Sequence, residues 1–101
     1  MNRDLPTAML AELAPTVGTG SLSQQPIGRA ATVARVCAPA HAPEWADWLA
    51  DLGFIPGERV MVTARSLPGG DPLAVRIGSS TFALRRAEAA CVQVLPDPAA
   101  P

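Results

Sequence analysis

The sequence contains no lysine and no tyrosine. Its eight basic residues are all arginine, and it has a single histidine, His41. Without lysine there is no Schiff-base lysine and no phosphate-loop lysine, and one histidine leaves few groups for proton transfer near neutral pH. The G-x-S-x-G, H-E-x-x-H, G-x-x-x-x-G-K-[ST] and C-x-x-C motifs are absent as well. We therefore expect a protein that is not an enzyme and that holds no cofactor.

Strong net charge and long apolar runs are also missing. The formal net charge is -1 at pH 7, so no broad positive field favours nucleic acid or anionic lipid. No window approaches the roughly 20 apolar residues of a membrane-spanning helix, and the N-terminal stretch lacks the apolar core of a signal peptide. Two cysteines, Cys37 and Cys91, are too few for a disulfide framework. These absences predict a cytoplasmic protein.

The 101 residues suit one domain with one modest core. Residues 1–26 mix Pro, Thr, Gly, Ser and Gln around one short apolar patch, which predicts a flexible N-terminal arm. We expect residues 27–96 to form the domain and residues 97–101 to form a disordered tail.

Periodic apolar residues predict one helix within residues 44–52, EWADWLADL. Trp45, Trp48, Leu49 and Leu52 follow the i, i+3, i+4, i+7 spacing of one apolar stripe, and Gly53 suits a left-handed C-cap. We expect Trp48 to lie mainly in the core and Trp45 to be partly exposed.

The remaining apolar segments read as short strands separated by Gly and Pro turns. In residues 58–66, Val60, Val62 and Ala64 alternate with polar residues and are predicted to point inward. The predicted strands are residues 29–36, 58–66, 73–77, 81–85 and 91–95. One further helical turn is predicted over residues 85–90. This order predicts a mainly β protein, a small five-stranded barrel with one α-helix between strands 1 and 2 and a short helical turn before the last strand.

Three segments in register resemble the FeoA family. They are LADLGFIPGERVMV, LPGGDPLAVRI and FALRRAEAACVQV, and the match covers roughly residues 25–95. The resemblance implies an SH3-like barrel that acts beside the ferrous iron transporter FeoB, a membrane protein with a cytosolic GTPase domain. It implies a non-enzymatic accessory that docks on FeoB and modulates or helps assemble it, with membrane association only through the transporter. Weak self-association stays open.

The predicted helix carries an acidic face and an aromatic face. Glu44, Asp47 and Asp51 fall within a wedge of about 60° away from the tryptophan stripe. This wedge could meet a partner's arginines, or it could be an ordinary solvated surface. With Trp45 it forms the predicted docking face.

The corner after the helix and a pair of arginines extend this prediction. Phe54 and Ile55 could contact a partner or fill the core. Arg85 and Arg86, with Arg76 on a nearby strand, could bind carboxylates or a phosphate, or they could be solvated near Glu88.

The two cysteines and the histidine are the strongest candidates for a metal site, although no metal site is predicted. Cys37 and His41 lie four residues apart, and Cys91 could approach them because first and last strands are often neighbours in small barrels. Structural zinc usually needs four protein ligands, so two ordinary thiols and a loop histidine are the simpler interpretation.

Two other functions remain open at this stage. An SH3-like regulatory or peptide-binding module would need an aromatic-lined groove, and an RNA-binding barrel would need a basic stripe with exposed aromatics. The composition favours neither.

Overall fold

The structure is a computed structural model that describes residues 19–97. Within these residues, six strands form one antiparallel sheet in the order β1-β6-β2-β3-β4-β5. The strands are β1 (Gly20–Ser21), β2 (Ala30–Val36), β3 (Arg59–Arg65), β4 (Leu73–Ile77), β5 (Ser80–Leu84) and β6 (Val92–Pro96). The helices are the 3-10 helix η2 (Leu22–Gln24), α3 (Glu44–Leu52) and α4 (Arg86–Ala89).

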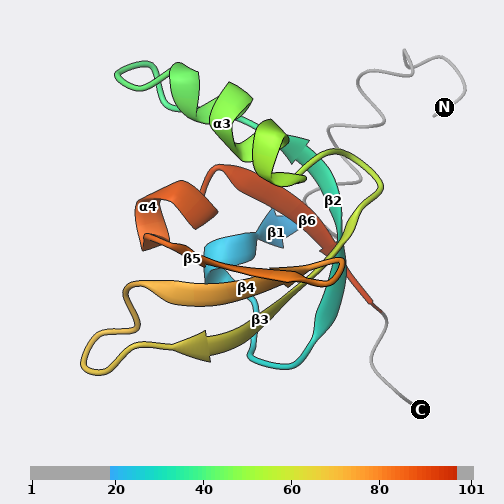
Figure 1. Cartoon of the computed structure of the whole chain (residues 1–101), viewed down its shortest axis with the longest axis vertical. Helices are drawn as coiled ribbons and strands as arrows, with labels where there is room; N and C mark the ends of the chain where they lie inside the picture. The colour runs from blue at the N-terminus through green and yellow to red at the C-terminus, as the bar shows by residue number, and fades with distance from the viewer. Residues whose placement is uncertain (1–18, 98–101) are drawn as a thin grey trace, which may run out of the picture.

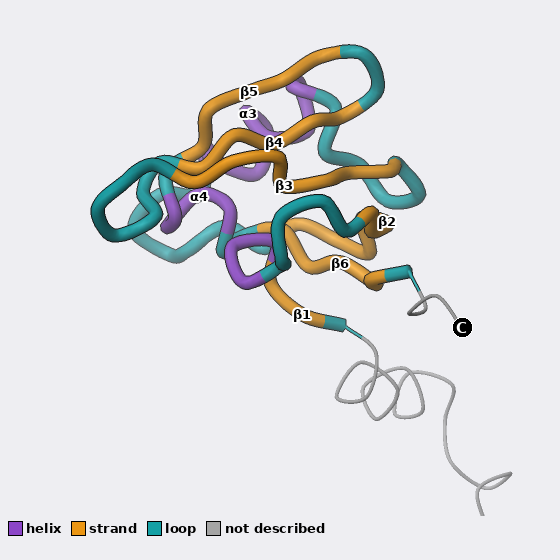
Figure 2. Tube along the Cα trace, turned by 90° about the horizontal axis from the view of Figure 1, so that it is seen from below, coloured by secondary structure: helices purple, strands orange, loops and turns teal. Residues whose placement is uncertain are grey.

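The sheet folds over on itself. Figure 2 shows β3, β4 and β5 on one side of the core and β2, β6 and β1 on the other. Buried Val, Leu and Phe side chains fill the space between them. Figure 1 shows α3 across one end of this sheet and α4 beside it, between β5 and β6. The mainly β architecture and the positions of both α-helices confirm the predicted fold class.

The strand count differs from the prediction because the chain contributes a strand before residue 27. Gly20 pairs with Val94 and Ser21 with Gln93, so β1 extends the sheet beside β6. The side chain of Leu22 is 0% exposed and joins the core. The predicted arm is therefore wrong for residues 20–25, which pack into the domain, whereas residues 1–18 lie outside the described residues.

Arg65 holds this N-terminal segment against β3. Its guanidinium donates hydrogen bonds to the carbonyl oxygens of Ser23, at 2.7 Å, and Gln25, at 2.8 Å. Arg65 can reach them because the register between β3 and β4 shifts between Val62 and Ala64. This bulge leaves Ala64 exposed, which corrects its predicted inward position, since an extra residue in one strand reverses the alternation beyond it.

The end of β6 is fixed by two arginines. The guanidinium of Arg59 forms a bidentate ion pair with Asp97, at 2.6 and 2.5 Å, and Arg29 donates to the Asp97 carbonyl oxygen at 2.6 Å. The Asp97 amide also donates to the carbonyl of Ala30. Asp97 thus belongs to the domain and not to a disordered tail, while residues 98–101 lie outside the described residues. We call this arrangement the Asp97 clasp.

Candidate functional site

The helix α3 lies on the sheet through one apolar stripe. Leu49 is fully buried, and Trp45 and Leu52 are partly buried against the core. Pro43 precedes the helix with φ -63°, and Gly53 ends it with φ 114°, where its N–H donates to the carbonyls of the last turn. The sequence therefore predicted both ends of this helix.

Trp48 is more exposed than predicted. Its exposed fraction is 39%, whereas Trp45 is half-buried. The buried stripe is centred on Trp45, Leu49 and Leu52, and Trp48 lies about 60° from that centre at 100° per residue. The prediction that Trp48 is mainly core is wrong because the helix rotates this side chain to the edge of the contact.

The acidic wedge lies beside Trp48. Glu44, Asp47 and Asp51 are all exposed. The one salt bridge among residues 19–97 joins Arg59 and Asp97, so none of the three carboxylates is paired with a described residue. The first turn holds Glu44 and Asp47, where the positive end of the helix dipole favours negative charge. An unpaired acidic surface and an exposed indole thus lie side by side on α3.

The two predicted docking residues in the corner after α3, Phe54 and Ile55, differ in their exposure to solvent. Ile55 is 46% exposed, but Phe54 is 0% exposed and its ring packs near that of Phe82, with centroids 6.4 Å apart. Gly57 takes φ 95° and its amide donates to the carbonyl of Val33 at 2.9 Å, which ties the corner to β2. Phe54 therefore belongs to the core and is not a surface contact, whereas Ile55 remains available.

The predicted arginines do not form one patch. Arg85 and Arg86 are exposed at the start of α4, where the Arg85 amide donates to Glu88 Oε1 at 2.8 Å and the Arg86 amide donates to Asp71 Oδ1 at 3.0 Å. Arg76 pairs with Thr81 at the other end of the β4–β5 hairpin. Four residues of strand, about 13 Å, separate Thr81 from Arg85. Only Arg85 and Arg86 are neighbours.

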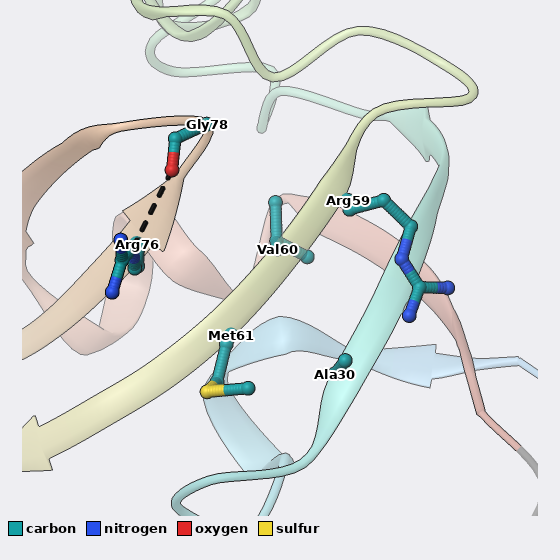
Figure 3. A pocket seen from close by; sticks show the side chains of 6 residues that line it. All are labelled: Ala30, Arg59, Val60, Met61, Arg76 and Gly78. Carbon is teal, nitrogen blue, oxygen red and sulfur yellow. Dashed lines mark hydrogen bonds between the residues drawn. The ribbon is translucent and has the colours of Figure 1, made fainter.

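Arg76 instead lines a hollow on the outside of the sheet that sequence reasoning missed. The hollow measures about 190 Å³, and Figure 3 shows Arg59 and Arg76 on its two sides with Met61 between them. Arg59 is already engaged by Asp97, and Arg76 donates to the carbonyl of Gly78 at 3.4 Å. The hollow depends on β2 and β4 flanking β3, and no local sequence signal predicts that pairing.

A second hollow, of about 340 Å³, brings together the two cysteines and the histidine. Cys37, His41 and Cys91 all line it, together with Trp45 of α3 and Ala87 and Ala90 of the α4 region. The expectation that the first and last predicted strands are neighbours is confirmed, because β2 pairs with β6. Among the described residues, however, no group of three His, Cys, Asp or Glu side chains has a spacing that could hold a metal ion. We call this space the cysteine hollow.

The comparisons with known proteins decide the family. The FeoA domain family model matches residues 20–96. The chain belongs to the FeoA family. The match begins at the first residue of β1, in agreement with the packed position of β1 and η2. No curated protein sequence matches the chain.

Solved structures of FeoA proteins share this fold. FeoA of Stenotrophomonas maltophilia, described as an SH3 domain protein complexed with zinc, is 39% identical, with a TM-score of 0.67 over 73% of this chain and 87% of that one. FeoA of Chlorobium tepidum is 32% identical, with a TM-score of 0.62 over 74% of this chain and 68% of that one. The iron(II) transport protein A of Clostridium thermocellum is 31% identical, with a TM-score of 0.63, and the match spans 74% of this chain and 44% of that one. The SH3-like barrel of the FeoA family is thus the fold of this protein.

Membership in this family links the protein to ferrous iron transport. No helix within residues 19–97 has the length and apolar character needed to cross a bilayer.

Proposed function

We propose that this protein is a non-enzymatic accessory of ferrous iron uptake that docks on the cytosolic part of the FeoB transporter and acts at the cytoplasmic face of the membrane. The observation that carries the docking surface is the exposed face of α3, where Glu44, Asp47 and Asp51 are unpaired with described residues beside Trp48. Family membership supports the link to ferrous iron transport.

The chemistry of this face suits protein recognition. Large aromatic side chains carry much of the binding energy at interfaces, and surrounding charges set orientation and association rate. Trp48 supplies the aromatic group, and Ile55 on the adjacent corner adds a second exposed apolar side chain. A partner surface with arginine or lysine around an apolar pocket would complement α3.

The start of α4 carries the opposite charge. Arg85 and Arg86 are exposed there, and Trp45 of α3 lines the same hollow as Ala87 and Ala90 of the α4 region. An acidic area on α3 and a basic area at the α4 start would fix the orientation of a partner that carries the reverse pattern. We therefore keep Trp45, Asp47, Asp51, Ile55, Arg85 and Arg86 in the proposed surface and add Trp48.

Such docking can change transport without any catalytic group in this chain. A bound domain shifts a transporter between two states when it binds one of them more tightly. Preference for one nucleotide state of FeoB would suffice.

The test is a pull-down of detergent-solubilised FeoB from the same organism, with and without guanine nucleotide. The docking variant Trp48→Ala, Asp47→Arg replaces exposed side chains and raises the net charge by two. Its control, Ser66→Arg, Leu67→Arg, makes the same charge change in the β3–β4 loop, where Leu67 is 92% exposed. We expect the docking variant to lose at least about tenfold in affinity, as for a contact residue of an interface, and the control to bind like wild type.

The opposite results are equally informative. Intact binding by a folded docking variant would place the interface away from α3, and Arg85→Glu, Arg86→Glu would then test the α4 start. Absence of wild-type binding in every nucleotide condition would contradict direct docking on FeoB.

The two alternative functions gain no support from the site. The tryptophans lie on one helix, where Trp45 is half-buried, and Arg76 lies at the opposite end of the β4–β5 hairpin from Arg85 and Arg86. A polyproline peptide would need an aromatic groove, and RNA would need a continuous basic stripe.

A further inference from the structure

Cys37 and Cys91 are cross-strand neighbours. The antiparallel ladder of β2 and β6 ends with Arg35 paired with Gln93 and Val36 paired with Val92, and Cys37 and Cys91 are the next residues beyond its last pair. The Cys37 amide donates to the Cys91 carbonyl at 2.8 Å and the Cys91 amide donates to the carbonyl of Glu88, so one backbone hydrogen bond joins the two cysteines. Opposed residues in such ladders have Cα atoms about 4.5–5.5 Å apart, and disulfides bridge Cα separations of about 4.4–6.8 Å.

Both thiols open onto one space. Opposed residues of an antiparallel pair lie on the same face of the sheet, and both cysteines line the cysteine hollow. Neither is in a disulfide, and Cys37 is exposed whereas Cys91 is 6% exposed. The Cys91 thiol donates to the carbonyl of Ala87 at 3.5 Å. The pair thus combines an accessible sulfur with a sheltered one.

We propose that Cys37 and Cys91 form an oxidisable dithiol, in which a peroxide oxidises Cys37 and Cys91 then closes an intramolecular disulfide. This modification site is independent of the docking proposal. It uses the cysteine hollow, in which the described residues do not assemble three metal ligands.

The chemistry balances with hydrogen peroxide as the oxidant. The Cys37 thiolate attacks one peroxide oxygen, an S–O bond forms, the O–O bond breaks, and the leaving hydroxide takes a proton to become water. The sulfur of Cys91, deprotonated as it attacks, then displaces hydroxide from the Cys37 sulfenic acid, which leaves as a second water. The sum is two thiols and one peroxide giving one disulfide and two waters.

The surroundings set the order of these two steps. Burial, with the negative charges of Cys37 and Glu88, raises the pKa of the Cys91 thiol above its usual range, so Cys91 has less reactive thiolate. Cys37 is exposed and is reached first by a small oxidant. Cys91 is the resolving residue because the backbone hydrogen bond beyond the end of the β2–β6 ladder holds it beside Cys37.

The test treats the reduced full-length chain with a small excess of hydrogen peroxide. We expect the intact mass to fall by two hydrogen atoms, a peptide map to show Cys37 joined to Cys91 within one chain, and dithiothreitol to restore the original mass. Trp45 lines the same hollow, so in a Trp48→Phe background its fluorescence should fall on oxidation and recover on reduction.

Two variants separate the roles. Cys91→Ala should accumulate a Cys37 sulfenic acid that dimedone traps, and Cys37→Ala should leave Cys91 at least about tenfold slower to react, because burial and a raised pKa limit it. The wild-type peptide map needs neither variant to fold. If wild type gains oxygen on Cys37 while Cys91 stays reduced, or if Cys37 links two chains, the intramolecular dithiol is overturned.

Discussion

Trp45 and Trp48 have the same side chain but different neighbours. Trp45 packs against the core, and its ring meets that of His41 at an interplanar angle of 73° with centroids 6.0 Å apart. Trp48 is 39% exposed beside the acidic wedge. A Trp45→Ala change would therefore disturb packing as well as any interface, whereas Trp48→Ala tests the surface with less effect on the core.

Gly53 is the residue whose conformation ends α3. Its φ of 114° lies where side chains are strained, although a Cβ there would meet only the Ile77 side chain, at ordinary distances of 3.5 Å to Cδ1 and 3.9 Å to Cγ1. We expect Gly53→Ala to reduce the free energy of unfolding by about 1–2 kcal/mol through backbone strain alone.

Chemical denaturation of Gly53→Ala and Gly20→Ala measures this effect. Gly20 does not have a positive φ, and a Cβ there meets Gln25 Nε2 at 3.7 Å, so its substitution should be the milder one. Equal losses of unfolding free energy in the two variants would show that the positive φ at Gly53 adds no strain to an alanine side chain.

At the scale of elements, the Asp97 clasp joins the ends of β6, β3 and β2. The hydrogen bond from Arg59 lowers the pKa of the Asp97 carboxyl below its ordinary value, and the nearby charges of Arg59 and Arg29 act in the same direction against desolvation. A carboxyl whose pKa is lower in the folded state stabilises that state above its unfolded pKa, and this contribution is lost as the pH falls through the folded pKa.

We therefore expect the stability difference between wild type and Asp97→Asn to be present at neutral pH, to begin to shrink as the pH falls to the ordinary Asp pKa of about 3.9, and to vanish only below the lower pKa of the folded state. Both side chains of the pair are well exposed, at 58% and 38%, so the difference should be small and should shrink as salt is added. Thermal unfolding across pH and salt measures it. A difference that persists at low pH would assign the effect to the backbone and not to the ion pair.

Other elements show where sequence reasoning succeeded and where it failed. The helix Glu44–Leu52 was predicted to the residue because a strong stripe and a glycine cap mark it. The rotation of this helix about its own axis was not predicted, because the spacing of apolar residues defines the buried face only to within the width of one side chain. Trp48 lies at the edge of that face. The β3 bulge that exposes Ala64 comes from pairing with β4, which no pattern within β3 reveals. The pairing of the first and last predicted strands was expected, and it allowed Cys91 to approach Cys37; the register that places them together comes from the structure.

At the scale of the whole molecule, β1 and η2 complete the domain. Two residues of strand are too few to show a period, and Leu22 is a lone apolar residue among Gly, Ser and Gln, so the sequence predicted a flexible arm there. The structure buries Leu22 fully and packs η2 against α4 and β6.

Leu22→Ala tests whether this segment belongs to the folded unit. We expect a loss of about 2–5 kcal/mol in the free energy of unfolding, as for a fully buried leucine. Leu67→Ala, at a position that is 92% exposed, should change it by less than about 0.5 kcal/mol. Denaturant unfolding of both proteins compares them, and a neutral Leu22→Ala would mean that the segment contributes nothing to the core.

The position of β6 between β1 and β2 has a consequence for how this domain is made on the ribosome. The last strand of the domain to be synthesised is the one that two of the earliest strands need as their neighbour. Until residues 92–96 leave the exit tunnel, β1 has no strand to pair with, β2 has one open edge, and Leu22 lacks part of its packing. Non-local pairing of this kind delays folding. The nascent domain therefore completes its core only after translation has passed the end of β6.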